Sequence, residues 1–182
     1  MIISITGTPG TGKTSISKLL KTNGFEVIDF NKVAIENNFI IEKDKKRDSF
    51  IVDINKFNRF VKKNYSQKNI IFIEGHLSHL LKSANRVIIL RCYPDELKKN
   101  LSKKGWNKNK IKENLEAEIL DVILVEALEL HKPKNVFEID TTRRSINDVF
   151  SSVNEIIENG FRNMKKYNIG KIDWSEEILK DF

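Results

Sequence analysis

Short apolar runs rich in Ile, Val and Phe recur along the chain and alternate with segments whose apolar residues have helical spacing. Strands that alternate with helices form a mostly parallel sheet with helices on both faces. The pattern therefore predicts an α/β fold built on a five-stranded parallel sheet. The five runs expected to form its strands are Ile2 to Ile5, Phe25 to Ile28, Ile70 to Ile73, Val87 to Leu90 and Val136 to Ile139.

Several of the intervening helices are marked by residues that favour a helix N-terminus. Asp53 is placed to cap the segment that follows it, and Pro94 occupies a first-turn position. Ser145 with Asp148 three residues later forms a capping-box pattern. We expect helices from Thr14 to Lys21, from Ile54 to Asn64, from Pro94 onward, from about Lys110 to Leu130 as one long helix, and from Ile146 to Glu158.

Two stretches interrupt the alternation of strands and helices. About forty residues, 31–68, separate the second and third predicted strands, and the stretch 103–112 lies between the fourth and the fifth. The chain after Gly160 has the character of an appended tail, in which Tyr167, Ile172 and Trp174 are candidates for anchoring it to the body. The sequence contains no internal repeat and no low-complexity linker.

Composition limits the class of protein. The chain of 182 residues has the size of one domain, and 40% hydrophobic with 31% charged residues excludes a disordered polyelectrolyte. Its longest apolar runs are far shorter than the roughly 20 residues of a membrane span, and no secretory signal is recognisable, so we expect no membrane association. The single cysteine, Cys92, excludes an internal disulfide framework, so a cytoplasmic location is expected.

The positive charge of the chain is concentrated in one segment. The 32 Lys and Arg residues exceed the 25 Asp and Glu residues by seven, and the stretch 97–112 holds seven lysines and no acidic residue. For a single lysine, a solvated helix face is the simpler explanation. As a group, the seven would attract a polyanion, and Gly105 with Trp106 among them suggests a turn able to move over bound phosphates.

The most informative motif runs from Gly7 to Thr14 and fits G-x-x-x-x-G-K-[ST] in full. It follows a predicted strand and precedes a predicted helix, the context that distinguishes a phosphate-binding loop from a fortuitous glycine-rich turn. Glycines such as Gly10 and Gly12 let backbone amides converge on phosphate oxygens at a helix N-terminus. Lys13 would then reach the β and γ phosphates of ATP, the Thr14 hydroxyl would ligate Mg²⁺, and Ser15 would add a further phosphate contact.

A second candidate site follows the third predicted strand, which ends in Glu74, Gly75 and His76. The carboxyl ends of parallel strands line the ligand crevice, so these side chains should lie near the phosphate-binding loop. A hydrophobic strand ending in an acid is the Walker B arrangement, in which Glu74 would hold Mg²⁺ directly or through water. The imidazole of His76 would orient a water or accept a proton. A salt-bridged carboxylate and a hydrogen-bonding turn histidine are the structural alternatives.

In combination, these motifs resemble those of the nucleoside monophosphate kinases, and more narrowly the adenylate kinase isoenzyme six family of coilin-interacting nuclear ATPases and their archaeal members. The resemblance covers roughly residues 1–157. It rests on the loop from Gly7 to Thr14, on Glu74-Gly75-His76, on Leu90-Arg91, and on the segment from Leu101 to Asn107 that leads into Asn114-Leu115-Glu116-Ala117-Glu118. The tail from Gly170 to Glu177 is similar to that of archaeal members in particular.

The resemblance implies a P-loop NTPase fold with an AMP-binding insertion and a short lid. It also implies the activity ATP + AMP = 2 ADP, ATPase activity, and a role in small ribosomal subunit maturation with a small-subunit ribosomal protein near rRNA. By matching position, Gly10, Gly12, Lys13, Thr14 and Ser15 become ATP contacts. The single domain 1–182 would then divide into a core (1–30, 69–96 and 113–160), a nucleoside monophosphate insertion (31–68), a lid (97–112) and a tail (161–182).

Three positions depart from the family pattern. Glu74 stands where an aspartate is usual, Ile35 stands at a position that many members fill with arginine, and Lys104 replaces the usual lid arginine. Lysine keeps the charge but lacks the bidentate geometry of arginine, so both of the latter changes weaken phosphate clamping. Lys43, Lys45, Lys46 or Arg47 would have to compensate.

Three functions are therefore compatible with the sequence. The first is an adenylate kinase-like phosphotransferase in which Lys13 and Lys104 stabilise the transferred group. The second is an assembly factor whose ATP binding and hydrolysis switch its contact with a ribosomal protein or rRNA, with His76 orienting water. The third is a kinase for another nucleoside monophosphate. The physiological acceptor, the oligomeric state and the role of the tail stay open at this stage.

Overall fold

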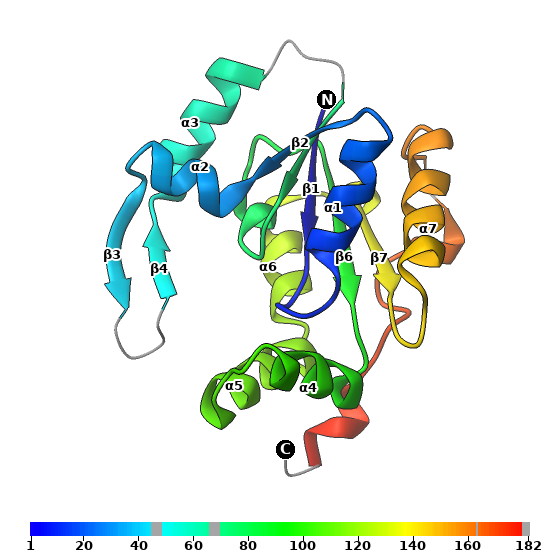
Figure 1. Cartoon of the computed structure of the whole chain (residues 1–182). Helices are drawn as coiled ribbons and strands as arrows, with labels where there is room; N and C mark the ends of the chain where they lie inside the picture. Colours follow the sequence, from blue (N-terminus) through cyan, green and yellow to red (C-terminus); the bar gives the residue numbers. More distant parts are fainter. Residues whose placement is uncertain (45–48, 66–69, 163, 180–182) are drawn as a thin grey trace.

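The computed structural model describes residues 1–44, 49–65, 70–162 and 164–179. Its central sheet consists of parallel strands in the order β2-β5-β1-β6-β7 (Figure 1). This arrangement confirms the predicted five-stranded parallel sheet. The strands are β1 (Ile2–Thr6), β2 (Glu26–Asp29), β5 (Ile71–Glu74), β6 (Arg86–Arg91) and β7 (Val136–Asp140).

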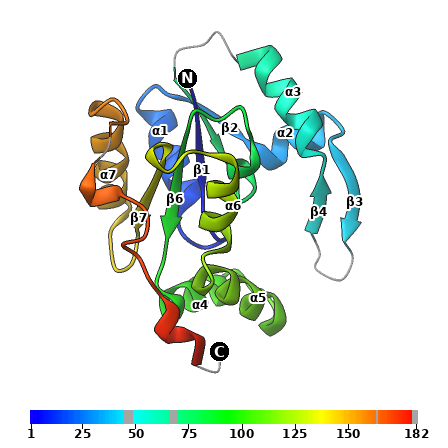
Figure 2. The same ribbon diagram turned by 180° about the vertical axis from the view of Figure 1, so that it is seen from behind.

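Helices cover both faces of this sheet (Figures 1 and 2). On one face, Val153 of α7 belongs to the same core as Ile3 of β1, whereas on the other face Leu124 of α6 packs with Ile89 of β6. Alternating strand residues point to opposite faces, which is why a fully covered strand such as β1 is apolar at successive positions. The helices are α1 (Lys13–Thr22), α2 (Phe30–Glu36), α3 (Ile54–Tyr65), α4 (Pro94–Lys103), α5 (Lys108–Ile119), α6 (Val122–Leu130) and α7 (Ile146–Glu158), with short 3₁₀ helices η1 (Ser78–Leu80), η2 (Pro133–Asn135), η3 (Lys165–Tyr167) and η4 (Ser175–Leu179).

The predicted caps form as expected. The Asp53 carboxylate accepts from the Lys56 amide at 2.9 Å, and Ser145 and Asp148 form a reciprocal capping box at the start of α7. Pro94 is the first residue of α4.

The insertion between β2 and β5 packs beside one edge of the sheet (Figure 1). It contains α2, α3 and a two-stranded antiparallel hairpin of β3 (Ile40–Asp44) and β4 (Ser49–Val52). Phe30 of α2 and Phe57 of α3 stack with ring centroids 4.2 Å apart and share a core with Ile73 of β5. The predicted compensating residues Lys45, Lys46 and Arg47 lie outside the described residues.

The prediction of one long helix from Lys110 to Leu130 was wrong, because the structure has two helices there, α5 and α6. Asp121 adopts a left-handed conformation with φ 55°, which aspartate tolerates better than most residues. The Glu118 carbonyl accepts from the Asp121 amide and from Arg91 Nη2, instead of from the residue-122 amide that an unbroken helix would supply. The apolar spacing continues through the break, so periodicity alone predicts a single helix.

Helices α4 and α5 form a helical hairpin beyond the carboxyl ends of the sheet strands (Figure 1). Gly105 makes the turn between them with φ 73°, and Leu97 and Leu101 of α4 are buried against Ile111 and Leu115 of α5. Helix α4 crosses the predicted lid boundary at residue 97, and α5 crosses that at residue 112. The division into core and lid therefore stays a prediction.

The tail folds back on the chain, passing from beside α7 and β7 to α4 and α5 (Figure 2). Tyr167 is buried in the main core, and Trp174 meets Tyr93 edge to face with ring centroids 5.3 Å apart. The Tyr93 hydroxyl donates to Glu177 at 2.8 Å. Two of the anchors suggested by the sequence thus make contacts in the structure. Across the described ranges of the chain, helices of the length and apolarity required to cross a bilayer are absent.

Candidate active site

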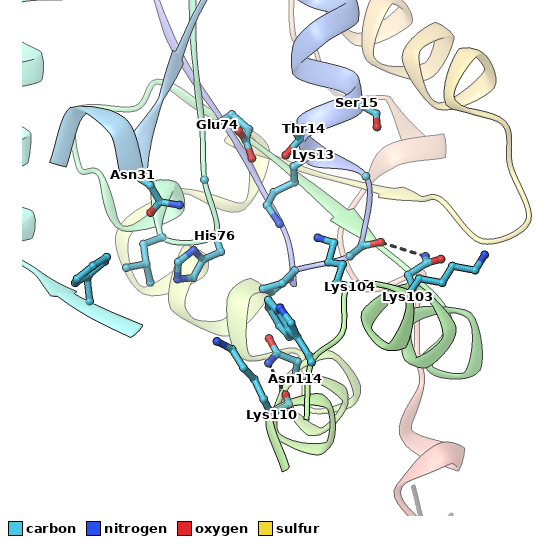
Figure 3. A pocket seen from close by; sticks show the side chains of 18 of the residues that line it. Lys13, Thr14, Ser15, Asn31, Glu74, His76, Lys103, Lys104, Lys110 and Asn114 are labelled. Atoms are coloured by element: carbon cyan, nitrogen blue, oxygen red, sulfur yellow. Dashed lines mark hydrogen bonds between the residues drawn. The ribbon is translucent and has the colours of Figure 1, made fainter. Parts of the chain in front are cut away.

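A cavity of about 900 Å³ opens at the carboxyl ends of β1 and β5 (Figure 3). It is bordered by the phosphate-binding loop, the segment after β5, the insertion, and the turn between α4 and α5. The eight residues that the sequence predicts for the site all line this cavity: Gly10, Gly12, Lys13, Thr14, Ser15, Glu74, His76 and Lys104. Their proximity is a structural fact, whereas their individual roles remain predictions.

The glycine-rich loop connects β1 to α1. Gly10 and Gly12 have φ values of 99° and 96°, a left-handed region that side chains other than glycine rarely enter. Lys13 begins α1, and its ammonium donates to the carbonyl oxygens of Gly7 at 2.7 Å and Thr8 at 3.1 Å. The loop therefore presents a helix N-terminus and a buried cation at the same end of the cavity, which is the geometry that phosphate oxygens require.

The ammonium of Lys13 is held in surroundings that oppose its charge. Burial lowers the pKa of Lys13 to about 8, the neighbouring Glu74 carboxylate counteracts this, and Lys104 lowers the pKa further. Lys13 therefore retains its proton at neutral pH, but its pKa lies closer to neutral pH than that of an exposed lysine. An anion placed beside it would restore the preference for the charged form.

Glu74 and His76 leave β5 in the direction of the same cavity (Figure 3). Burial raises the pKa of Glu74, while the positive charge of Lys13 lowers it. Burial, followed by the nearby charge of Lys13, lowers the pKa of His76 to about 4. His76 is consequently a neutral imidazole at pH 7, able to orient a water or accept a hydrogen bond.

The oxygen atoms beside the loop suit a small divalent cation. The Thr14 hydroxyl and the Glu74 carboxylate face the same part of the cavity, and both are hard oxygen ligands of the kind that Mg²⁺ prefers (Figure 3). Groups of three or more His, Cys, Asp or Glu that could hold a metal by themselves are absent from the described residues. A cation at this position would therefore depend on nucleotide phosphates and water for its remaining ligands, as Mg²⁺ commonly does.

The turn between α4 and α5 brings lysines to the cavity. The cavity is lined here by Lys103, Lys104 and Lys110. The indole of Trp106 lies near both Lys104 and Lys110. The ammonium of Lys110 is 4.6 Å and that of Lys104 is 5.9 Å from the centre of the indole ring. The quadrupole of an aromatic ring attracts cations, so Trp106 allows two like charges to be held close together.

The insertion side of the cavity is mainly apolar. Ile35 of α2 and Phe50 and Val52 of β4 line it, together with the amide of Asn31. No arginine is among the lining residues in the part of the chain that the structure describes. Lys43 is not at the cavity wall; its ammonium lies 6.0 Å from the centre of the Phe50 ring.

Comparisons with known proteins show the family to which the chain belongs. A family model described as an AAA domain matches residues 3–121. Two relatives named "Putative adenylate kinase", from Methanocaldococcus jannaschii and Methanosarcina barkeri, are 40% and 42% identical. Each alignment covers 98% of this chain, with 96% and 100% of the respective relative. The chain belongs to this adenylate kinase-like family of P-loop proteins.

Solved structures of P-loop kinases share the family fold at low sequence identity. Thymidylate kinase from Candida albicans is 14% identical with a TM-score of 0.59, covering 87% of this chain and 91% of that one. Shikimate kinase from Bacteroides thetaiotaomicron is 15% identical with a TM-score of 0.59, covering 87% and 98%. The fold is therefore that of the P-loop kinases.

Some residues of the site were not predicted from the sequence. The Asn100 amide of α4 donates to the Gly10 carbonyl at 3.2 Å, and Glu118 of α5 accepts from the Thr8 hydroxyl at 2.5 Å. The position of Glu118 could have been inferred, because it falls on the same helix face as the buried Ile111 and Leu115. A carboxylate on such a face needs a partner, but the sequence does not reveal which one.

Arg91 differs from the lysines that follow it in the sequence. Its guanidinium is buried at the end of β6, donating from Nε to Glu118 at 2.8 Å, from Nη1 to Glu138 at 2.5 Å, and from Nη2 to Asp121. Arg91 is thus neutralised inside the protein. The family motif Leu90-Arg91 therefore supports the loop from behind rather than adding to the basic lining of the cavity.

Proposed function

We propose that the protein is an adenylate kinase-like phosphotransferase that catalyses ATP + AMP = 2 ADP and also hydrolyses ATP. The supporting observation is that one cavity joins the phosphate-binding loop to the insertion, with Glu74 and His76 between them. A volume of about 900 Å³ is near the upper end of the roughly 300–1,000 Å³ found for small-molecule sites, which suits a donor and an acceptor together. The relatives named "Putative adenylate kinase" support the same choice of substrates.

Phosphoryl transfer needs positioning and charge stabilisation more than a protein nucleophile. The loop amides and the N-terminus of α1 would hold the ATP phosphates, and Lys13 and Lys104 would stabilise charge on the transferred group. An oxygen of the acceptor phosphate would attack the γ-phosphorus, and the bond to the β–γ bridging oxygen would break, which leaves ADP. Mg²⁺, held by Thr14 and by Glu74 directly or through water, would neutralise charge on the phosphates.

The acceptor half of the site favours a group with an apolar face. Ile35 and Phe50 offer a hydrophobic surface against which a nucleobase could pack, and the Asn31 amide offers hydrogen bonds. Neutral His76 would orient the acceptor phosphate or, in ATP hydrolysis, the attacking water. We propose AMP as the acceptor, in line with the name of the relatives. Because the described lining has no arginine fork, we keep another nucleoside monophosphate as the alternative.

A coupled assay for ADP with ATP and each of AMP, GMP, CMP, UMP and dTMP should show acceptor-dependent formation of ADP, largest with AMP. The rate of ADP formation with a bound monophosphate should exceed the rate with ATP alone by at least about tenfold, because the bound acceptor is an oriented nucleophile that replaces water. Equal rates of ADP formation with and without every monophosphate would exclude the kinase. A maximum with a monophosphate other than AMP would support the alternative acceptor.

A second candidate function is an ATP-dependent switch in maturation of the small ribosomal subunit, with a small-subunit ribosomal protein and rRNA as partners. It is favoured by the basic surface of α4 and α5. Lys98, Lys99, Lys108 and Lys112 are exposed and are not among the residues lining the cavity, so they form a basic surface that would attract a polyanion. The free, buried Cys92 accords with the cytoplasmic location predicted from the sequence.

The switch predicts that a recombinant small-subunit ribosomal protein is retained differently by the ATP-bound and ADP-bound forms. Reversing charge at Lys98, Lys99, Lys108 and Lys112 together should weaken an rRNA contact and reduce its salt dependence. A matched variant with Lys62 and Lys63 of α3 reversed controls for a general change of charge, since both are also exposed. Absence of association in both nucleotide states would remove the switch without affecting the kinase proposal.

A further inference from the structure

Thr8 is one of the residues that connect the phosphate-binding loop to the rest of the fold. Its carbonyl accepts from Lys13 Nζ at 3.1 Å and from the Thr11 hydroxyl at 2.9 Å. Its hydroxyl donates to Glu118 Oε2 at 2.5 Å. Thr8 is 2% exposed, and its carbonyl, together with that of Gly7, sets the place at which the Lys13 ammonium rests.

Glu118, the partner of Thr8, is held firmly in turn. Its second carboxylate oxygen accepts from Arg91 Nε at 2.8 Å and from the Cys92 amide at 3.1 Å. Both oxygens of the Glu118 carboxyl group therefore act as hydrogen-bond acceptors. Buried at 3% exposure and fixed at both oxygens, Glu118 has little freedom to release Thr8.

The same helix reaches the cavity at its other end. Lys110 and Asn114, about two turns and one turn before Glu118 on α5, line the cavity, whereas Glu118 in the last turn contacts the loop. Side chains four residues apart lie on one face of a helix, so Asn114 and Glu118 share a side. One rigid element therefore relates the loop to the basic turn on the opposite wall.

We propose that Glu118 is a positioning residue for the triphosphate: it fixes Thr8, and through the Thr8 carbonyl the Lys13 ammonium, in register with Lys110 on its own helix. This inference rests on the proposed binding of ATP at the glycine-rich loop. Glu118 touches no reacting atom in this scheme and acts only through Thr8. Its effect should consequently be on the triphosphate and not on the acceptor bound at the insertion.

The test is the isosteric substitution Thr8→Val, which removes the hydroxyl and keeps the volume. We expect the dissociation constant and the KM for MgATP to rise about tenfold, the equivalent of one buried hydrogen bond, with the KM for AMP unchanged within about twofold. Thr8→Ser, which restores the hydroxyl, should return both constants to near the wild-type values. If Thr8 had a purely structural role, the substitution would lower thermal stability without raising the KM for MgATP selectively over that for AMP.

Tyr167→Phe is the matched control, because it also removes a hydroxyl that donates to a glutamate, here Glu155 of α7. It should leave both constants unchanged. Glu118→Gln should weaken ATP binding in the same direction as Thr8→Val, since an amide cannot accept at both positions. The double variant should bind ATP with an affinity within about twofold of that of the more affected single variant, because Glu118 acts through Thr8.

Wild-type affinity for ATP in Thr8→Val would overturn the inference, as would equal weakening of ATP and AMP, or additive effects in the double variant. Affinity is measured by titration calorimetry, independently of turnover. A wild-type protein that binds ATP but forms no acceptor-dependent ADP would refute the kinase proposal alone. In that case the Thr8→Val titration still decides the role of Glu118.

Discussion

Replacing Lys13 with methionine should reduce ATP turnover by about a thousandfold, to near the background rate. Lys13 is the buried cation at the mouth of the loop, and removing one preorganised group that stabilises developing charge typically costs about 10²–10³ in rate. Methionine keeps a flexible apolar stem of similar length. Initial rates of ADP formation at saturating Mg²⁺ and ATP measure the effect.

The same substitution should not destabilise the fold. The lowered pKa of Lys13, about 8, means that its burial opposes the charged form, so the wild-type protein bears an electrostatic cost that methionine removes. Because this pKa is depressed below the unfolded value, the cost is fully present below pH 8 and fades as the pH rises toward 10.5. Urea unfolding at pH 7 should therefore give an unchanged or higher free energy of unfolding for Lys13→Met.

Lys18→Met provides the control, since Lys18 lies on the same helix but is exposed and away from the cavity. It should keep wild-type turnover. A folded Lys13→Met protein with turnover within about tenfold of wild type would contradict the assignment of Lys13 to the transferred group.

The sheet and the phosphate-binding loop could be predicted from the sequence because each depends on local information. Strands such as β6 are buried on both faces and appear as continuous apolar runs, and the loop needs its glycines and Lys13 at fixed spacing. Glu74 and His76 could be placed near the loop by the rule that strand carboxyl ends meet at one edge. These predictions required no knowledge of long-range side-chain contacts.

The apolar cavity wall formed by the insertion and the contacts behind the loop could not be predicted in the same way. Ile35 and Phe50 belong to different elements of the insertion and meet at the cavity only through its folding. Asp121 interrupts an apolar periodicity that by itself favours one helix, and its backbone conformation coincides with an ion pair to Arg91, which is 30 residues away in the sequence. Such contacts depend on tertiary structure, which spacing and composition do not encode locally.

Arg91→Met should destabilise the protein by about 3–5 kcal/mol at pH 7. The guanidinium is 2% exposed and faces the carboxylates of Glu118, Glu138 and Asp121, the first two of which are also buried. Removing one partner of a buried ionic network leaves uncompensated charge, which costs more than the pair itself contributed. Urea unfolding followed by circular dichroism measures the free energy, and Arg86→Met on the same strand is the control, with an expected loss below about 1 kcal/mol.

The loss caused by Arg91→Met should shrink as the pH falls. Burial already raises the pKa of Glu138, an effect that Arg91 opposes, so removing Arg91 should raise it further. A carboxyl whose folded pKa exceeds its unfolded value contributes stability that is complete below the unfolded value and is lost as the pH rises through the folded one. The variant should therefore be closer to wild type near pH 4.5 than at pH 7, and adding Glu138→Gln should recover part of the loss at pH 7. A loss that is independent of pH and unaffected by Glu138→Gln would mean that Arg91 contributes through packing instead of charge, since its apolar stem is buried as well.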